Sequence, residues 1–273
     1  MINKKLIMLA IFLVSLLAVS SASATDNVAG DIVGVDETVP GIVKNTTDDS
    51  VSADESGIAT FDELAKEINA SEKGKVLDLA KDYMYVNGPT NGIRLDKAIT
   101  IDGHGATLDG DHLSRIFNVT ADNVMLKNIQ FINARSDGDG GAVHWNGKGG
   151  VLSNCTFVDC SASNGGAVYA YLSSISLIDC SFLGNSAGNG ASAYLMFSLA
   201  KFIDDSFVNN KATNSSAAIF SMVSVNSIEG CDFINNSVRS KSPFGAAIAF
   251  YQYETNISNS RFINNSINGE YGY

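Results

Sequence analysis

Large apolar residues recur along the second half of the chain at a nearly constant interval. The repeat is clearest when the chain is aligned on phenylalanine, with successive separations of 26, 25, 25, 26 and 29 residues: Phe131, Phe157, Phe182, Phe207, Phe233 and Phe262. A large apolar residue also lies five positions before each phenylalanine, and another lies one position after it. Self-similarity at a period of about 20 to 50 residues is typical of solenoids and repeat arrays.

The local pattern within each repeat favours β-structure. Helical repeats require apolar residues at a spacing of about 3.6, whereas these units contain short alternating runs rich in Gly, Asn, Ser and β-branched residues. The frame of a leucine-rich repeat is absent. The sequence therefore predicts an all-β parallel β-helix with about 25 residues per turn, in which each strand pairs with its equivalent one turn later.

In such a coil, equivalent side chains lie about 4.8 Å apart along the axis. The six phenylalanines are then expected to form an inward stack. The residue three positions after each phenylalanine is expected to form a second column, in which amides hydrogen-bond between turns. The asparagines of this column are Asn185, Asn210, Asn236 and Asn265.

A paired glycine marks one corner of the predicted turn. The strings DGGAVHWN and NGGAVYAY place Gly140-Gly141 and Gly165-Gly166 at equivalent positions. We expect these corner glycines where the backbone adopts a positive φ or passes close to its neighbour. Later repeats keep small residues there: Gly190-Ala191, Ala217-Ala218 and Gly245-Ala246-Ala247.

The ends of the predicted coil differ in character. Thr60 and Glu63 form a capping box at the start of an amphipathic helix, which is expected over about 61–71 with Gly74 as its stop signal. This helix is expected to cap the solenoid within residues 58–92. The β-helix is expected over 93–273, with an incomplete last turn. Its exposed edge permits self-association unless Tyr271 and Tyr273 fold back over it.

The first 57 residues show no repeat. Two lysines, an apolar run of fourteen residues (6–19) and Ala22-Ser23-Ala24 predict a signal peptide over 1–24, and residues 25–57 form an acidic, disordered spacer. Cleavage removes the two lysines and moves the net charge from −11 to −13. Such an acidic exported chain lacks the basic face that nucleic-acid binding requires, and we expect no membrane span after cleavage.

Three segments carry a resemblance to a known family. They are ITIDGHGATLDG (99–110), SRIFNVT (114–120) and NVMLKNIQFIN (123–133), followed by the repeated FxxN and GGA[IV] elements. Over roughly 58–273 the chain resembles adhesin-like surface proteins of methanogenic archaea with polymorphic outer-membrane protein-type repeats. The resemblance implies a right-handed, pectin-lyase-like parallel β-helix displayed at the cell surface. We expect no C-terminal barrel of the autotransporter type.

β-Helices also include polysaccharide lyases and hydrolases, and three segments of this chain resemble catalytic or metal-binding elements. Gly103-His104-Gly105 resembles an element of polygalacturonases, but its companion elements are missing, and a turn is favoured. Asp137 and Asp139 fall short of the six to eight oxygen ligands that Ca²⁺ takes. Asp204-Asp205 resembles a catalytic pair. Asp204, however, stands at a position that is polar in most of the repeats, so the repeat itself accounts for the pair. These comparisons predict no catalytic, cofactor or metal site.

The remaining chemistry is that of thiols and imidazoles. Cys155, Cys180, Asp205 and Cys231 lie two positions before successive phenylalanines, in a register predicted to face inward. Parallel stacking places the Cβ atoms of Cys155 and Cys180 near 4.8 Å, longer than about 3.8 Å in a disulfide, so buried free thiols are favoured over a bridge. The three histidines, His104, His112 and His144, show no zinc spacing.

These observations favour an extracellular or cell-surface adhesin-like protein without catalytic activity. Its expected partners are cell-surface glycans or proteins, or further copies of itself at the open turn, with no cofactor. A polysaccharide lyase or glycoside hydrolase and a structural subunit of the cell envelope remain as alternatives.

Overall fold

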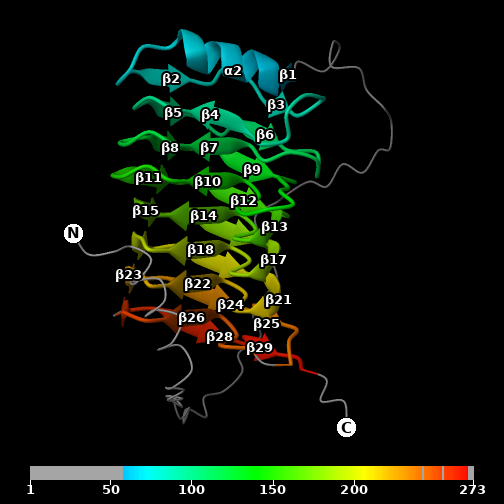
Figure 1. Cartoon of the computed structure of the whole chain (residues 1–273), viewed down its shortest axis with the longest axis vertical. Helices are drawn as coiled ribbons and strands as arrows, with labels where there is room; N and C mark the ends of the chain where they lie inside the picture. The colour runs from blue at the N-terminus through cyan, green and yellow to red at the C-terminus, as the bar shows by residue number, and fades with distance from the viewer. Residues whose placement is uncertain (1–57, 242, 254, 270–273) are drawn as a thin grey trace, which may run out of the picture. The chain divides into compact units, whose positions relative to one another are not determined.

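The computed structural model describes residues 58–241, 243–253 and 255–269. The predicted signal peptide and spacer, together with Tyr271 and Tyr273, lie outside these residues. All strand pairs are parallel and form four sheets, named A to D here. Because neighbouring strands in each sheet come from successive turns, the described chain is a parallel β-solenoid (Figure 1). The predicted all-β parallel β-helix is confirmed.

The strands of each sheet follow one another along the solenoid axis. Sheet A contains β1 (Ala59–Thr60), β3 (Tyr83–Met84), β6 (Thr107–Asp109), β9 (Gln130–Ile132), β12 (Thr156–Val158), β16 (Ser181–Leu183), β20 (Ser206–Val208), β24 (Asp232–Ile234) and β28 (Arg261–Ile263). Sheet B contains β2 (Val76–Asp78), β5 (Thr100–Asp102), β8 (Met125–Lys127), β11 (Gly150–Ser153), β15 (Ser174–Ile178), β19 (Leu199–Ile203), β23 (Val225–Glu229) and β27 (Thr255–Ser258).

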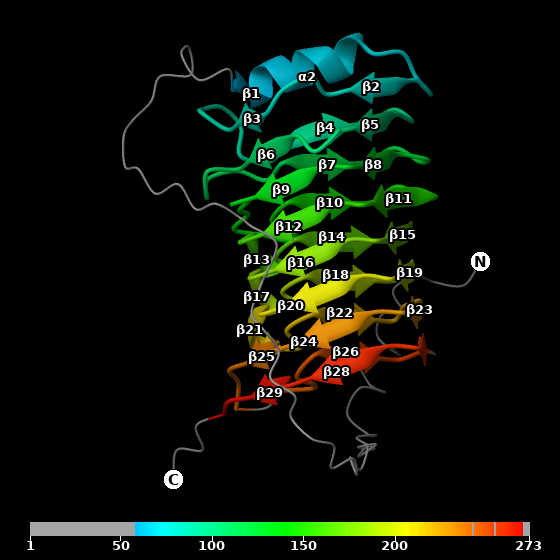
Figure 2. The ribbon, with the colours of Figure 1, turned by 180° about the vertical axis from the view of Figure 1, so that it is seen from behind.

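Sheets C and D complete the wall. Sheet C contains β4 (Ile93–Leu95), β7 (Phe117–Val119), β10 (Val143–Trp145), β14 (Val168–Tyr171), β18 (Ala193–Met196), β22 (Ile219–Met222) and β26 (Ile248–Tyr251). Sheet D contains β13 (Ser161–Asn164), β17 (Ser186–Asn189), β21 (Lys211–Ser215), β25 (Ser237–Val238) and β29 (Ser266–Ile267). Each full turn runs through C, B, A and D, and the turns before β13 have loops in place of sheet D (Figure 2).

Among the described residues, one short helix, α2 (Phe61–Ala70), covers the first turn (Figure 1). Its capping box is formed by Thr60 and Glu63 as predicted, and its buried face consists of Phe61, Leu64 and Ile68. The helix ends before Ser71, whose amide donates to two helix carbonyls, so the predicted stop at Gly74 is late. No helix in the described part of the chain is long and apolar enough to cross a membrane.

The expected boundary at residue 93 does not interrupt the sheets. Strand β2 pairs with β5 in sheet B, and β3 pairs with β6 in sheet A. The helix and the strands that follow it are therefore continuous with the solenoid.

The repeated phenylalanines stack along the axis in sheet A. Their ring centroids lie 4.7–4.9 Å apart with interplanar angles of 1–6° from Phe131 to Phe262. The first five rings are fully buried. The expectation that Phe262 is also buried is wrong, because its side chain is 49% exposed in the last described turn. The Phe233 ring stacks on one face of Phe262, and no described turn covers its other face.

The asparagine column is buried beside the phenylalanine stack. The Nδ2 group of Asn185 donates to Oδ1 of Asn210 at 3.0 Å and to the carbonyl of Phe157 at 3.1 Å. Its own Oδ1 accepts the backbone N–H of Cys160. Asn210 and Asn236 repeat this arrangement. Each amide thus joins three turns and meets the hydrogen-bonding requirement of a buried polar group.

Single left-handed residues form the bends between sheets. Between sheets B and A, and between A and D, these residues are mainly Asn and Asp: Asn128, Asn154, Asp179, Asp204, Asn259, Asn133, Asp159, Asn209, Asn235 and Asn264. Asn and Asp tolerate this conformation better than other side chains. The Asn or Asp that recurs at these bends, with Gly184 and Gly230 in its place in two turns, is therefore a backbone requirement.

The double-glycine corner joins sheet D to sheet C. Gly140 and Gly165 have φ values of 71° and 62°. Gly141 and Gly166 instead pass close to the next turn, since a Cβ on Gly141 would lie 2.1 Å from the carbonyl oxygen of Gly166. The first glycine of each pair is therefore required by its positive φ, and the second by the close approach of the next turn.

Inside the solenoid, residue size is balanced between sheets C and B. Trp145 is fully buried, and a Cβ on Gly150 would lie 2.3 Å from its indole ring. In the next turn the equivalent positions hold Ala170 and Ile175. A large side chain in one sheet thus accompanies a small one in the other, as close packing requires.

Phe207→Ala is expected to lower the free energy of unfolding by about 3–5 kcal/mol, because it leaves a cavity between two stacked rings. Phe262→Ala is the matched control, and its effect should be below about 2 kcal/mol since half of that ring is already exposed. Urea unfolding followed by circular dichroism measures both. Equal effects of the two substitutions would contradict the burial difference.

Gly150→Ala is expected to destabilise the protein by about 1–3 kcal/mol, because the methyl group displaces the Trp145 ring from a close-packed site. Trp145 is the single tryptophan, so its fluorescence reports the displacement directly. An unchanged emission spectrum together with unchanged stability would show that the ring does not contact this glycine.

Candidate functional site

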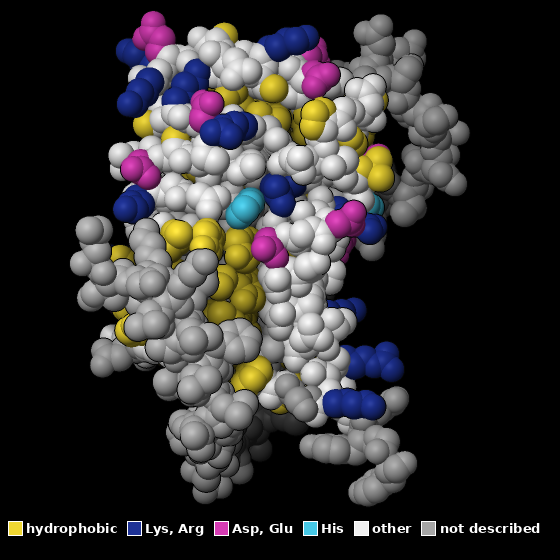
Figure 3. All heavy atoms as spheres, viewed as in Figure 1, with side chains coloured by type: hydrophobic (Ala, Val, Ile, Leu, Met, Phe, Trp, Pro, Cys, Tyr) yellow, Lys and Arg dark blue, Asp and Glu magenta, His cyan; other side chains and the backbone are white. Residues whose placement is uncertain are grey.

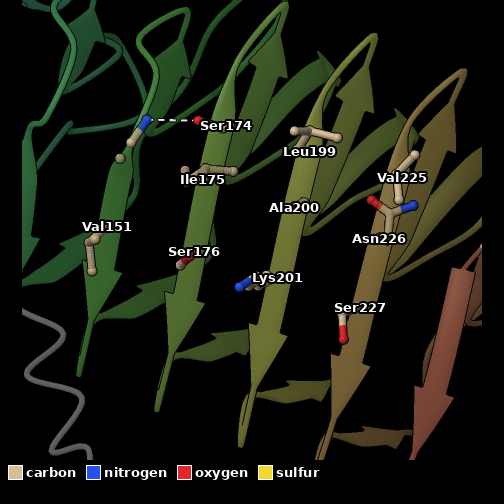
Figure 4. Close-up of a pocket in the computed structure, with 12 residues that line it drawn as sticks. Val151, Ser174, Ile175, Ser176, Leu199, Ala200, Lys201, Val225, Asn226 and Ser227 are labelled. Carbon is tan, nitrogen blue, oxygen red and sulfur yellow. Dashed lines mark hydrogen bonds between the residues drawn. The ribbon is translucent and has the colours of Figure 1, made fainter.

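An open groove of about 420 Å³ runs across the outer face of sheet B (Figure 4). It crosses strands β11, β15, β19 and β23, so four successive turns contribute to it. Strand alternation decides which side chains face it. Leu152, Leu177, Phe202 and Ile228 are fully buried inside the solenoid. Their neighbours Val151, Ser176, Lys201 and Ser227 therefore face outward in a row along the groove.

One border of the groove is apolar. Leu199 is 58% exposed and Val225 is 46% exposed, at equivalent positions in β19 and β23. In the preceding turn Ser174 occupies this position and accepts a hydrogen bond from the Gly149 amide at 2.7 Å. The groove thus combines exposed aliphatic side chains with hydroxyl groups and a single ammonium group, Lys201.

The bend beside this border differs from the other bends. Leu172, Phe197 and Val223 adopt φ values of 51°, 53° and 52° between sheets C and B. A left-handed conformation costs roughly 1–2 kcal/mol for such residues, and it is a clear outlier for a β-branched side chain. Strained backbone of this kind clusters at functional sites. Most left-handed residues at the other bends are Asn, Asp or Gly, with polar exceptions such as Ser216 and His104, so this bend keeps apolar side chains at an energetic cost.

An aromatic column lies on the outer face of sheet C, next to the same bend. Tyr169, Tyr194 and Phe220 stack with centroid distances of 5.4 and 5.0 Å. Tyr171, Met196 and Met222 pack against them. Figure 3 shows hydrophobic side chains gathered in a band on this face. Each of the three stacked aromatic residues is only 7% exposed.

The repeat pattern of the sequence predicted neither the groove nor the apolar bend nor the aromatic column. A signal for the column exists, since aromatic residues or methionine alternate with small or aliphatic residues after the corner, as in AVYAY and SAYLM. The same alternation is compatible with inward-facing aromatic residues, so it does not identify the face of the sheet on which the rings lie.

Among the described residues, the lining of the groove contains hydroxyl, amide, aliphatic and ammonium side chains and no carboxylate, imidazole or thiol. The lining is suited to non-covalent binding.

The Asp204-Asp205 pair does not converge on one site. Asp204 occupies an exposed left-handed bend with φ 54°, whereas Asp205 is 1% exposed and faces the core. Asp205 Oδ1 accepts the backbone N–H of Cys180 at 2.7 Å, and its Oδ2 has no partner in the described residues. Burial raises the pKa of Asp205 to about 8. Asp205 is therefore a protonated core residue near neutral pH.

The structure brings His104 together with two carboxylates from successive turns. Its Nε2 atom lies 2.9 Å from Asp78 Oδ1, and its Nδ1 atom lies 3.8 Å from Asp102 Oδ1. Among the described residues, these three form the group whose metal-ligand atoms approach one another. The two carboxylates, however, approach different nitrogens of the ring.

The ammonium group of Lys127 lies 2.7 Å from Asp102 Oδ2, where a cation bound by this carboxylate would lie. Burial acts to raise the pKa of Asp102, but hydrogen bonds from Lys127 and Asn128 lower it to about 2. Asp78, Asp102 and Lys127 are equivalent positions of β2, β5 and β8. This cluster is an ion-paired ladder that joins the first turns.

The other candidate residues have separate structural partners. Asp139 Oδ1 accepts from Asn164 Nδ2 at 2.8 Å, and Asp137 pairs with Arg135 at 3.3 Å. Their carboxylates therefore do not act jointly as a calcium site. His144 packs edge-on against Tyr169, and burial lowers its pKa. His112 adopts a left-handed conformation with φ 54° in the loop that follows β6.

All four cysteines are buried free thiols. Cys155 and Cys180 occupy equivalent positions, and each Sγ lies 3.5 Å from a carbonyl oxygen of the preceding turn. Burial raises the pKa of Cys160 and of Cys231 to about 12. Protonated, inaccessible thiols are poor nucleophiles and poor metal ligands.

Comparisons of this chain with protein-family models, with curated proteins and with solved structures give no match.

Asp205→Asn is expected to raise the free energy of unfolding at pH 8 and to leave it nearly unchanged near pH 4. Unfolded Asp205 releases its proton near pH 4, whereas the folded protein retains it up to about pH 8. The stability that the protonated residue contributes is therefore complete below about pH 4 and is lost as the pH rises through 8.

The difference between variant and wild type should grow by at most about 1.4 kcal/mol per pH unit in this window. Urea unfolding at pH 4, 6 and 8 measures it, with the exposed Asp204→Asn substitution as control. Parallel pH profiles for wild type and Asp205→Asn would exclude a raised pKa for Asp205.

Proposed function

We propose that this protein is an exported, adhesin-like β-solenoid that binds glycans, matrix or proteins at cell surfaces and performs no catalysis. The observation that carries the proposal is the groove on sheet B with its strained apolar bend. Side chains exposed at an energetic cost are best explained by a partner that covers them. The signal-peptide pattern and the acidic composition support export and solubility.

The chemistry of the outer faces favours binding over hydrolysis. A polysaccharide lyase or hydrolase needs an acid and a base that converge on one bond. The carboxylates and imidazole considered above instead form ladders, bends or core contacts. The groove itself presents hydroxyl groups and apolar side chains across four turns, which suits an extended ligand.

Val225→Asp is expected to reduce binding of the labelled full-length protein to cells at least fivefold, because it places a charge on the apolar border of the groove. Val76→Asp is the matched control. Val76 is a similarly exposed valine on the first strand of sheet B, outside the groove. Flow cytometry with both variants measures the effect. An equal loss of cell binding in both variants, or no loss in either, would show that the groove does not mediate binding.

Incubation with oligogalacturonate and other acidic polysaccharides is expected to release no products. Chromatography of the reducing ends provides the measurement. Turnover that is abolished by Asp204→Ala or by His104→Ala would replace the adhesin proposal with the enzymatic alternative.

A further inference from the structure

A second hollow, of about 460 Å³, lies beside the early turns, where sheet D has not yet begun. Three loops from successive turns line it, over residues 90–91, 112–113 and 135–138. A strand of sheet D would fill this position in later turns. The loops leave it open, so the hollow is a consequence of the late start of sheet D.

Arg115 holds these loops in place. Its side chain is only 8% exposed and donates from Nη1 to the carbonyl of Asn91, from Nη2 to Ser136 Oγ and from Nη2 to the carbonyl of Asp139. Its Nε donates to the Gly140 carbonyl at 2.8 Å. One buried guanidinium thus connects two of the lining loops to the double-glycine corner. The walls of the hollow are pre-organised without a ligand.

An exposed ion pair forms part of the wall. Arg135 Nη2 lies 3.3 Å from Asp137 Oδ1, and the two side chains are largely solvent-accessible. This single contact leaves most N–H donors of the guanidinium and most lone pairs of the carboxylate available. A third hollow, of about 260 Å³, lies on the other side of the same loop and is lined by Ser161, Ala162 and Ser163. Arg135 and Asp137 therefore contribute to two adjoining hollows.

The lining matches a neutral sugar. Adjacent hydroxyl groups both donate and accept hydrogen bonds, so they can satisfy a carboxylate and a guanidinium at once. Leu113, which is 55% exposed, supplies an apolar edge for the C–H groups of a pyranose ring. Pockets for small ligands typically enclose about 300–1,000 Å³. The larger hollow falls within this range.

The charges around the hollow argue against an ionic ligand. Arg135 and Asp137 offset each other, and the buried charge of Arg115 lies near Asp139. A phosphate or a carboxylate sugar would meet Asp137, and a metal ion would meet Arg135. Neither sign of charge is favoured overall.

We propose that the two adjoining hollows bind neighbouring units of a neutral oligosaccharide, with Arg135 and Asp137 contacting hydroxyl groups from both. The proposal rests on the proposed binding function and assigns one ligand class to a surface separate from the groove on sheet B. Arg115 is a positioning residue in this site and does not contact the sugar.

Gly138 provides a direct test. A Cβ at this position would meet only Ser136 Oγ, at 3.8 Å, so a larger residue fits the backbone and extends into open space. Titration calorimetry of the full-length protein with cellohexaose, mannohexaose and chitohexaose is expected to detect binding of at least one of them. Gly138→Leu and Arg135→Met should each raise its Kd at least tenfold, and Gly138→Ala should raise it less. Val76→Asp, which lies outside the groove and outside both hollows, should change it less than twofold. Circular dichroism establishes that each variant is folded.

The outcomes separate this site from the groove. Sugar binding that is unaffected by Gly138→Leu in the folded protein, or that is lost with Val225→Asp instead, overturns the proposed site while surface binding stands. Cell binding without affinity for any neutral hexasaccharide, or binding of oligogalacturonate alone, would also overturn the proposed site while surface binding stands. Absence of both cell binding and sugar binding overturns the site and the proposed function together.

Discussion

The backbone hydrogen bonds between turns hold each residue directly beside its equivalents in the turns before and after it. This register is the constraint on which the rest of the structure depends. Phe157, for example, pairs with Phe131 on one side and with Phe182 on the other. A side chain at an inward position must therefore pack against the equivalent side chains of the turns before and after it. Flat rings and carboxamides satisfy this condition because they stack and hydrogen-bond in the direction of the axis.

Deviations from the repeat are accommodated within the same register. Trp145 is accepted because Gly150 leaves room beside it, and the following turn reverses the sizes. Asp205 follows the cysteine column and keeps the hydrogen bond from the Cys180 amide, but its second oxygen is left without a partner. The solenoid therefore tolerates a polar residue in its core by holding it in the uncharged form, at the expense of stability above neutral pH.

The outer surface is less constrained than the core, and the candidate binding features lie there. At the other three bends most left-handed residues are Asn, Asp or Gly, which adopt this conformation easily, whereas the bend between sheets C and B uses Leu172, Phe197 and Val223. The two hollows around Arg135 arise differently, from the loops that precede sheet D and from the first strand of that sheet, β13. Both features lie outside the rows that stabilise the fold, so each can change without loss of the repeat.

The sequence by itself determined the period, the parallel stacking, the helical cap and the identity of the central columns. It does so because a residue that must match its neighbours one turn away recurs at a fixed interval that is visible in the chain. The tertiary structure alone decided which apolar residues are exposed. Leu199 and Phe202 are both apolar residues of one strand, and their faces follow from the path of the bends. Likewise, Phe262 belongs to the core column by register, but its burial depends on a covering turn.

The tertiary structure also decided which polar residues meet. Asp78, His104 and Lys127 come from three turns, and their spacing in the chain resembles no known site. The hollow near Arg135 likewise combines loops about 25 residues apart that share no motif. Such juxtapositions depend on the number of residues in each loop and on the twist between turns. Local sequence patterns contain the repeat but not these distances, which is why the fold was predictable and the binding surfaces were not.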